Sequence, residues 1–286
     1  MRGTRELATQ AAREAARVRA RLGIGPTSSL CPLDIAEALG IVVRLAALPS
    51  LEGMYAPGDR NTVLLGAERP WGRIRHTCGH ELGHHVFQHG TCVDELCVGR
   101  RPKWKPEEYL ADRFSTALTM PKLAVGDALR RRGWKPAELT AEQAFALAQN
   151  FGVGYRSFVS HAERSLRVLS PGAADSLRRQ GRPLGRVRRA VAGFEVEHDV
   201  FIGDQHWGAR PMDIETGDIV VVANDALFAG TCARLSREPE AHLVAVGPGE
   251  GQLKLRARRE PIRVRVGRRG FTGLARYRHL EEPQNE

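Results

Sequence analysis

Apolar residues recur every three or four positions in the first 40 residues of the chain, and this spacing predicts helices. Residues 4–22 match an amphipathic helix that closes at Gly23. Pro32 stands at a suitable first-turn position for a short helix that continues to Leu39 and ends at Gly40. Short extended stretches follow at residues 41–45, 54–56 and 62–65 and predict a small sheet.

Further helices are predicted in the next third of the chain. Pro70 opens a helix-compatible run that ends at Gly90, and after an irregular loop a second run extends over residues 106–120. Pro121 starts another helix, and residues 141–151 form the next. This part of the chain is therefore predicted to be helices over a small sheet.

The last third changes to a period of two, which is typical of strands. A segment rich in arginine precedes it: eight arginines stand between Arg164 and Arg189, against the single acid Asp175. The strand-like runs follow at residues 194–202, 219–223, 227–235, 242–246, 253–257 and 262–266. We therefore expect an α+β chain with a helical domain at 1–165, a linker at 166–193 and a small β barrel or sandwich at 194–281.

Composition narrows the class of protein. Of 286 residues, 42% are hydrophobic and 27% charged, which excludes disorder over most of the length. No apolar run approaches the roughly 20 residues of a membrane span, and the N-terminus has no secretory signal, so we expect a cytoplasmic protein without membrane contact. Five irregularly spaced cysteines do not suggest a disulfide framework.

The chemistry centres on the HExxH pattern His80-Glu81-Leu82-Gly83-His84, which falls inside a predicted helix. At 100° per residue, His80 and His84 lie about 40° apart on one face, so both imidazoles reach one metal ion. Glu81 projects beside them, where it can touch a metal-bound water without being a ligand. The pattern predicts a zinc site with Glu81 as the general base.

A catalytic zinc site needs a third protein ligand, and the next predicted helix offers one. Glu108 and Asp112 share a face of that helix, with Glu108 placed 24 positions after His84. We expect Glu108 to ligate the metal and Asp112 to accept the other ring N–H of a ligand histidine. Two alternatives stay open: Glu107 is a neighbouring rival ligand, and acidic residues also suit a solvated helix start.

Other residues near the motif carry weaker hypotheses. His85 and His89 are also four positions apart, but no glutamate follows the first of them, and we expect ordinary surface or core histidines. His76, Tyr55 and Tyr109 are candidates for stabilising the oxyanion. The predicted strand at 62–65 could present an edge to an extended peptide.

Together these residues resemble the ImmA/IrrE family of zinc-dependent metallopeptidases. The resemblance covers roughly residues 5–165 and is carried by the run from Arg73 to His84, by Glu108-Tyr109-Leu110-Ala111-Asp112-Arg113-Phe114, by Met120-Pro121 and by residues 147–153. The chain departs from the usual family pattern at His76, Gly79 and Gly154, and these departures leave the ligand set intact.

The resemblance implies a zincin-like, gluzincin-type domain that cleaves a protein. The implied substrate is a transcriptional repressor, often a helix-turn-helix protein, in a stress response or in control of mobile elements. The alternative hypothesis is a non-catalytic zinc-containing regulator whose C-terminal β domain binds a ligand, nucleic acid or a protein. The intact Glu81 disfavours this alternative.

The formal net charge of +10 raises the question of an acidic partner. Basic residues alternate with apolar ones near the C-terminus, and the turn at 259–261 predicts a hairpin. An arginine-biased genome also produces such a basic face. Three interpretations therefore stay open: a solvated surface, a weak contact with nucleic acid, or a contact with an acidic protein. The residues concerned are Lys254, Arg256, Arg258, Arg263 and Arg265.

Overall fold

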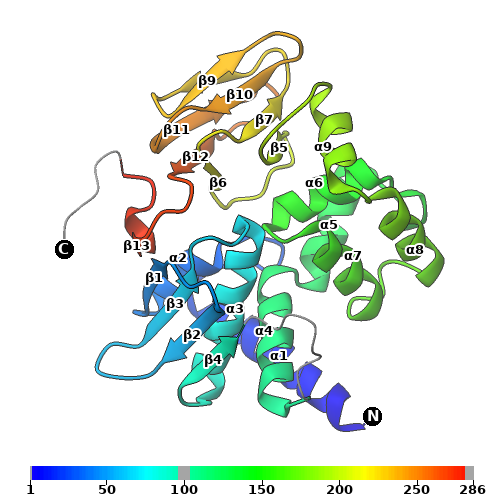
Figure 1. Cartoon of the computed structure of the whole chain (residues 1–286). Helices are drawn as coiled ribbons and strands as arrows, with labels where there is room; N and C mark the ends of the chain where they lie inside the picture. Colours follow the sequence, from blue (N-terminus) through cyan, green and yellow to red (C-terminus); the bar gives the residue numbers. More distant parts are fainter. Residues whose placement is uncertain (1, 96–103, 281–286) are drawn as a thin grey trace. The chain divides into compact units, whose positions relative to one another are not determined.

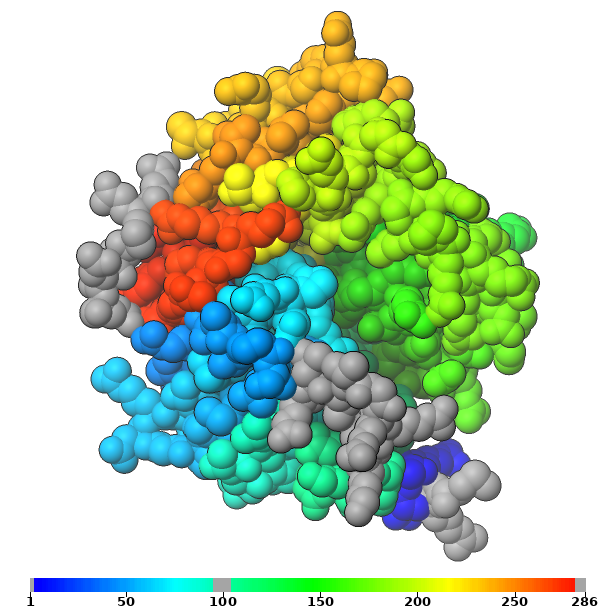
Figure 2. All heavy atoms as spheres, in the orientation of Figure 1, coloured from blue at the N-terminus to red at the C-terminus, as the bar shows by residue number. Residues whose placement is uncertain are grey.

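The computed structural model describes residues 2–95 and 104–280, and the remaining residues are drawn in grey in Figures 1 and 2. Contacts group the chain into two units. The N-terminal unit holds residues 1–125 together with 270–276, and the second unit holds residues 126–269 with the C-terminal end. Within the described ranges, no helix is long and apolar enough to cross a membrane.

A mixed five-stranded sheet organises the N-terminal unit, with the order β13-β1-β3-β2-β4. Strands β1 and β3 are parallel, and the other neighbours are antiparallel. The three stretches predicted as strands form β1, β2 and β3, but the outer strands were not predicted. One lies in the expected irregular loop, and the other comes from the far end of the chain. The strands are β1 (Val42–Ala46), β2 (Leu51–Ala56), β3 (Thr62–Gly66), β4 (Cys92–Glu95) and β13 (Gly273–Leu274).

The helices of this unit are α1 (Arg2–Arg21), α2 (Pro32–Ala38), α3 (Trp71–Phe87) and α4 (Pro106–Thr119). Helix α3 packs against β2, β3, α2 and α4, and α1 packs against α4 (Figure 1). Leu82, Phe114 and Leu118 are fully buried where these helices meet. The helix at the centre of this core is thus the one that carries the HExxH pattern.

A buried arginine fastens the end of α4. Arg19 on α1 donates to the carbonyl oxygen of Leu118 at 2.6 Å, to that of Gly25 at 2.7 Å and to that of Ser28. Burial lowers the pKa of Arg19 to about 10, so the side chain stays charged at neutral pH. A cation at the C-terminal end of a helix also interacts favourably with the helix dipole.

The second unit contains helices in the range that was expected to be a linker. Residues 166–193 include α8 (Pro171–Gln180), which Ser170 caps, and α9 (Leu184–Ala192). Ala174 and Leu177 on α8 and Val187 and Ala192 on α9 are buried, so this arginine-rich range forms two packed amphipathic helices. The other helices here are α6 (Ala141–Phe151) and α7 (Tyr155–Arg164), and α5 (Lys122–Arg132) begins before the division between the units.

The strands of the second unit form two four-stranded sheets around a shared core, with orders β5-β7-β10-β9 and β6-β12-β11-β8. The single run predicted at 227–235 is two strands in different sheets, separated by Gly230 at φ +145°. Strand β6 was not predicted. The strands are β5 (Val200–Gly203), β6 (Met212–Glu215), β7 (Ile219–Val222), β8 (Leu227–Ala229), β9 (Ala233–Ser236), β10 (His242–Ala245), β11 (Gly249–Lys254) and β12 (Ile262–Gly267).

Helix α6 and these strands are joined by a buried arginine. Arg210 donates from Nε to the carbonyl oxygen of Asn150 at 3.2 Å and from another guanidinium nitrogen to that of Gln149. Gly208 donates its N–H to the Asn150 side chain at 2.8 Å. The contacts therefore group α6 with the strands, whereas the sequence predicted a division after residue 165.

The basic hairpin near the C-terminus is largely neutralised by its own neighbours. Strands β11 and β12 pair antiparallel, as the predicted hairpin requires. Arg265, expected on an outer face, is instead buried against Asp213 on β6, which also accepts from Arg278 at 3.1 Å. Arg263 pairs with Glu250 on the neighbouring strand. These arginines stabilise the sheet rather than forming a free basic surface.

Removing Asp213 tests this role. Asp213→Ala should lower the free energy of unfolding by about 3–5 kcal/mol, because it leaves Arg265 and Arg278 buried without this carboxylate. Arg263→Ala is the matched control: its pair with Glu250 is exposed, and its loss should cost at most about 1 kcal/mol. Urea unfolding of both variants measures the difference, and equal costs would contradict the assignment.

Candidate metal centre

Helix α3 presents its two motif histidines on successive turns of one buried face. His80 is 6% exposed and His84 is fully buried. The helix stops at Phe87 because Gln88 adopts a left-handed conformation at φ 56° and caps the last turn with its N–H. The sequence predicted a helix that extends to Gly90, so α3 is shorter than expected. His89 therefore lies outside the helix.

The contact between α3 and α4 is close because two glycines face α4. A Cβ atom on Gly83 would lie 2.7 Å from the Cα of Ala111, and one on Gly79 would lie 2.5 Å from the hydroxyl of Ser115. The same hydroxyl donates to the carbonyl oxygen of His76 at 3.0 Å. The absence of side chains at these positions lets the two helices approach with their functional residues aligned.

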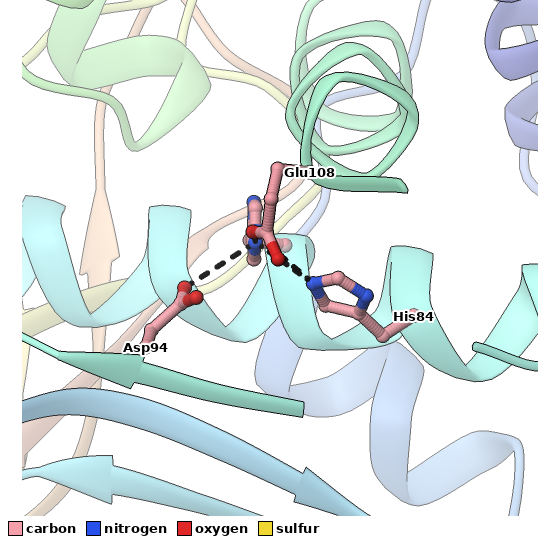
Figure 3. A group of neighbouring side chains, drawn as sticks. His84, Asp94 and Glu108 are labelled. Atoms are coloured by element: carbon pink, nitrogen blue, oxygen red, sulfur yellow. Dashed lines mark hydrogen bonds and ion pairs between the residues drawn. The ribbon is translucent and has the colours of Figure 1, made fainter. Parts of the chain in front are cut away.

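Four ligand atoms from three elements converge beside α3. His80 Nε2 lies 3.0 Å from His84 Nε2, 3.2 Å from Glu108 Oε2 and 3.3 Å from Asp94 Oδ2. His84 Nε2 lies 3.7 Å from Glu108 Oε2, and all four ligand atoms fall within 4.8 Å of one another. Figure 3 shows Asp94 reaching this point from β4 and Glu108 reaching it from α4.

This donor set fits a zinc ion. Four ligands at about 2.0 Å around a tetrahedral zinc lie about 3.3 Å apart, close to the three distances from His80 Nε2 to the other ligand atoms. Two imidazole nitrogens and carboxylate oxygens are also ligand types that zinc accepts. His80, His84, Glu108 and Asp94 could therefore hold the metal together.

Both histidines direct Nε2 toward the cluster and bind a partner through Nδ1. His80 Nδ1 lies 3.0 Å from Asp112 Oδ1, and His84 Nδ1 lies 2.9 Å from His89 Nδ1. An Nδ1–H that donates to these partners leaves Nε2 free to act as a ligand. Asp112 thus stands where the sequence predicted it, and His89 supplies the equivalent contact for His84.

The electrostatics of the cluster favour a cation. Burial lowers the pKa of His80, but the hydrogen bonds to Asp112 and Glu108 and the charge of Asp94 outweigh burial and raise it to about 10. The neighbouring imidazoles of His80 and His84 hold the pKa of Glu108 well below its usual range. Several carboxylates around two buried imidazoles therefore form a site that attracts positive charge.

Glu81 is fully buried beside this cluster, and neither carboxylate oxygen has a hydrogen-bond partner among the described residues. Burial raises the pKa of Glu81 to about 8, and the charges of Asp94 and Glu108 act in the same direction. Gly53 on β2 makes room for this carboxylate, since a Cβ atom there would lie 2.9 Å from Glu81 Oε1. A buried carboxyl group with a raised pKa and free oxygens suits proton transfer.

The remaining candidates from the sequence are placed elsewhere. Glu107 is exposed, whereas Glu108 is at the cluster. The Tyr55 hydroxyl contacts Asn61 and His85 Nδ1, and the Tyr109 ring lies under the Arg113 guanidinium. The sequence predicted that strand β3 could present a sheet edge to a peptide. This prediction is wrong, because β1 and β2 pair with β3 on its two sides.

Sequence reasoning missed Asp94 and His89. Asp94 lies on a four-residue strand, too short for a period-two signal, and it reaches the site by pairing with Gly53 on β2. His89 was placed on a continued helix that would turn it away from His84. Only the left-handed Gln88 reverses the chain, and glutamine carries no signal for that conformation.

The close helix contact can be tested at Gly83. Gly83→Ala should force α4 away from α3, lower stability by about 1–3 kcal/mol and weaken metal binding, because Glu108 and Asp112 move with α4. Gly126→Ala on α5 is the control, since a Cβ there meets nothing within 4 Å and alanine favours a helix. Urea unfolding and zinc content are the readouts, and wild-type values for Gly83→Ala would contradict the packing argument.

Comparison with known proteins agrees with this site. No curated protein matches the chain. The family model Peptidase_M78, described as the IrrE N-terminal-like domain, matches residues 36–161, a range that includes β1 to β4, α3 and α4. The resemblance noted from the motifs is confirmed over residues 36–161, which match this peptidase family.

Proposed function

We propose that this protein is a zinc-dependent endopeptidase that cleaves a helix-turn-helix transcriptional repressor. The observation that carries the proposal is the convergence of His80, His84 and Glu108 beside the buried carboxyl group of Glu81, within a peptidase-family domain. The repressor as substrate is an expectation from the ImmA/IrrE resemblance.

In the proposed mechanism, Glu81 moves the proton. A bound zinc lowers the pKa of water and polarises the scissile carbonyl group. Glu81 accepts a proton from the attacking water and then delivers it to the leaving nitrogen. Asp112 and His89 keep the two ligand imidazoles in the orientation and tautomer that this arrangement needs.

The oxyanion and the substrate need further contacts from the same region. His76 lies one turn before His80 on α3, and burial lowers its pKa, so it would offer a neutral N–H to the developing oxyanion. Strand β4 is last in the sheet order within the described ranges, and we propose that it, rather than β3, pairs with an extended peptide.

The alternative of a non-catalytic regulator is less well supported. A purely structural metal site has no use for a buried, unpartnered carboxyl group next to its ligands. Glu81 occupies that place, and the family match is to peptidases.

Metal analysis tests the ligand set. Purified protein should bind about one zinc, and His80→Ala, His84→Ala and Glu108→Ala should each weaken binding because each removes a metal bond. Glu107→Ala is the matched control for Glu108, since it removes the adjacent but exposed carboxylate. Full zinc occupancy in Glu108→Ala, with loss in Glu107→Ala, would reassign the third ligand.

Substitution of Glu81 tests the chemistry. Glu81→Gln should keep the zinc but lose cleavage of a helix-turn-helix repressor encoded next to this gene, because glutamine cannot accept the proton. Electrophoresis and mass spectrometry of the repressor measure the products. Cleavage at the wild-type rate by Glu81→Gln would contradict the mechanism. Failure of the wild-type protein to cleave the repressor would contradict the proposed substrate class.

A further inference from the structure

We propose that Asp94 is a fourth protein ligand that holds the metal centre in a closed, latent state, and that it must leave the metal before a peptide is cleaved. The inference rests on the proposed function, because it concerns regulation of the same site. The motifs in the sequence account for three ligands, and Asp94 belongs to none of them.

Asp94 approaches His80 almost as closely as Glu108 does. Its Oδ2 lies 3.3 Å from His80 Nε2, against 3.2 Å for Glu108 Oε2. It also lies within 4.8 Å of the ligand atoms of His84 and Glu108. A carboxylate oxygen at this distance from His80 Nε2, in the same cluster as the other two ligand atoms, can take the fourth position around the ion.

The number of ligands decides what a zinc site can do. Structural zinc sites have four protein ligands, whereas catalytic sites keep one position for water or substrate. Asp94 in the fourth position takes the place that the reaction requires. Glu81 and His84 are also fully buried in the described arrangement.

Asp94 is the ligand best placed to leave. His80 and His84 lie on a helix buried on several sides, and Glu108 lies on a helix that packs closely against it. Asp94 instead lies on β4, which has four residues and ends the sheet. The pairing of β4 with β2 is irregular between Leu51 and Gly53, directly beside the residue opposite Asp94. Fewer interactions hold this strand, so movement of the Asp94 side chain away from the metal costs less than displacement of a helix.

Three carboxylates contact His80, and two of them, Asp94 and Asp112, provide an internal comparison. Asp94 approaches Nε2, the nitrogen that faces the cluster, and Asp112 approaches Nδ1 on the other side of the ring. Loss of Asp94 should therefore change the number of ligands on the metal. Loss of Asp112 should weaken binding without changing that number.

Cobalt spectroscopy of the full chain tests the inference. We expect Co²⁺-loaded wild type to give the intense visible absorption of a tetrahedral site, and azide to leave it unchanged. Asp94→Ala and Asp94→Asn should bind zinc at least about 10-fold more weakly in a chelator competition. Their cobalt spectra should shift when azide is added, because a ligand position has opened. Asp112→Ala and the exposed Asp59→Ala are the controls, and neither should acquire the azide response.

Each outcome decides a separate point. An azide response in the wild type equal to that of both Asp94 variants would overturn the closed state, as would unchanged zinc affinity in those variants. Zinc binding that does not depend on His80 or Glu108 would instead overturn the proposed function. The conservative Asp94→Asn variant, checked by circular dichroism, distinguishes loss of a ligand from loss of the fold. Faster peptide cleavage by zinc-loaded Asp94→Asn would further support the latent state.

Discussion

The close contact between α3 and α4 is the constraint on which the metal centre depends. Gly83 lets the α3 backbone lie against Ala111, and Gly79 leaves room for Ser115. Histidines on one helix and carboxylates on another reach the same point only if the two axes are this near. The cost of glycine within a helix is about 1 kcal/mol each, and the approach that it permits offsets that cost.

This packing brings the histidines and carboxylates of the site into contact with one another. The two imidazoles and Glu81 are buried, which is unfavourable for any charge without a partner. Asp112 and His89 satisfy the outer nitrogens of the two histidines, while the inner nitrogens meet carboxylate oxygens. Among the residues that the structure describes, the carboxyl group of Glu81 has no hydrogen-bond partner, so the group that is most costly to bury is the one with a proposed chemical task.

Charged side chains of the second unit also find partners within the chain. A formal net charge of +10 suggests an acidic partner, yet several arginines that looked available bind their own chain. Arg265 is buried on Asp213, Arg263 pairs with Glu250, and Arg210 binds backbone carbonyls at the end of α6. Only exposed members of the hairpin, such as Lys254 and Arg256, remain for the predicted weak contact with nucleic acid or protein.

The sequence by itself determined the elements whose signals are local. The proline starts of α3 and α4 set their positions, and the spacing of His80 and His84 put both on one helical face. Tertiary structure decided the contacts between distant residues. Strand β13 joins β1 from the far end of the chain, Asp94 reaches the cluster through a short strand, and His89 returns after a left-handed residue. None of these follows from periodicity, because each depends on a neighbour that is remote in sequence or on a backbone angle that the residue type does not specify.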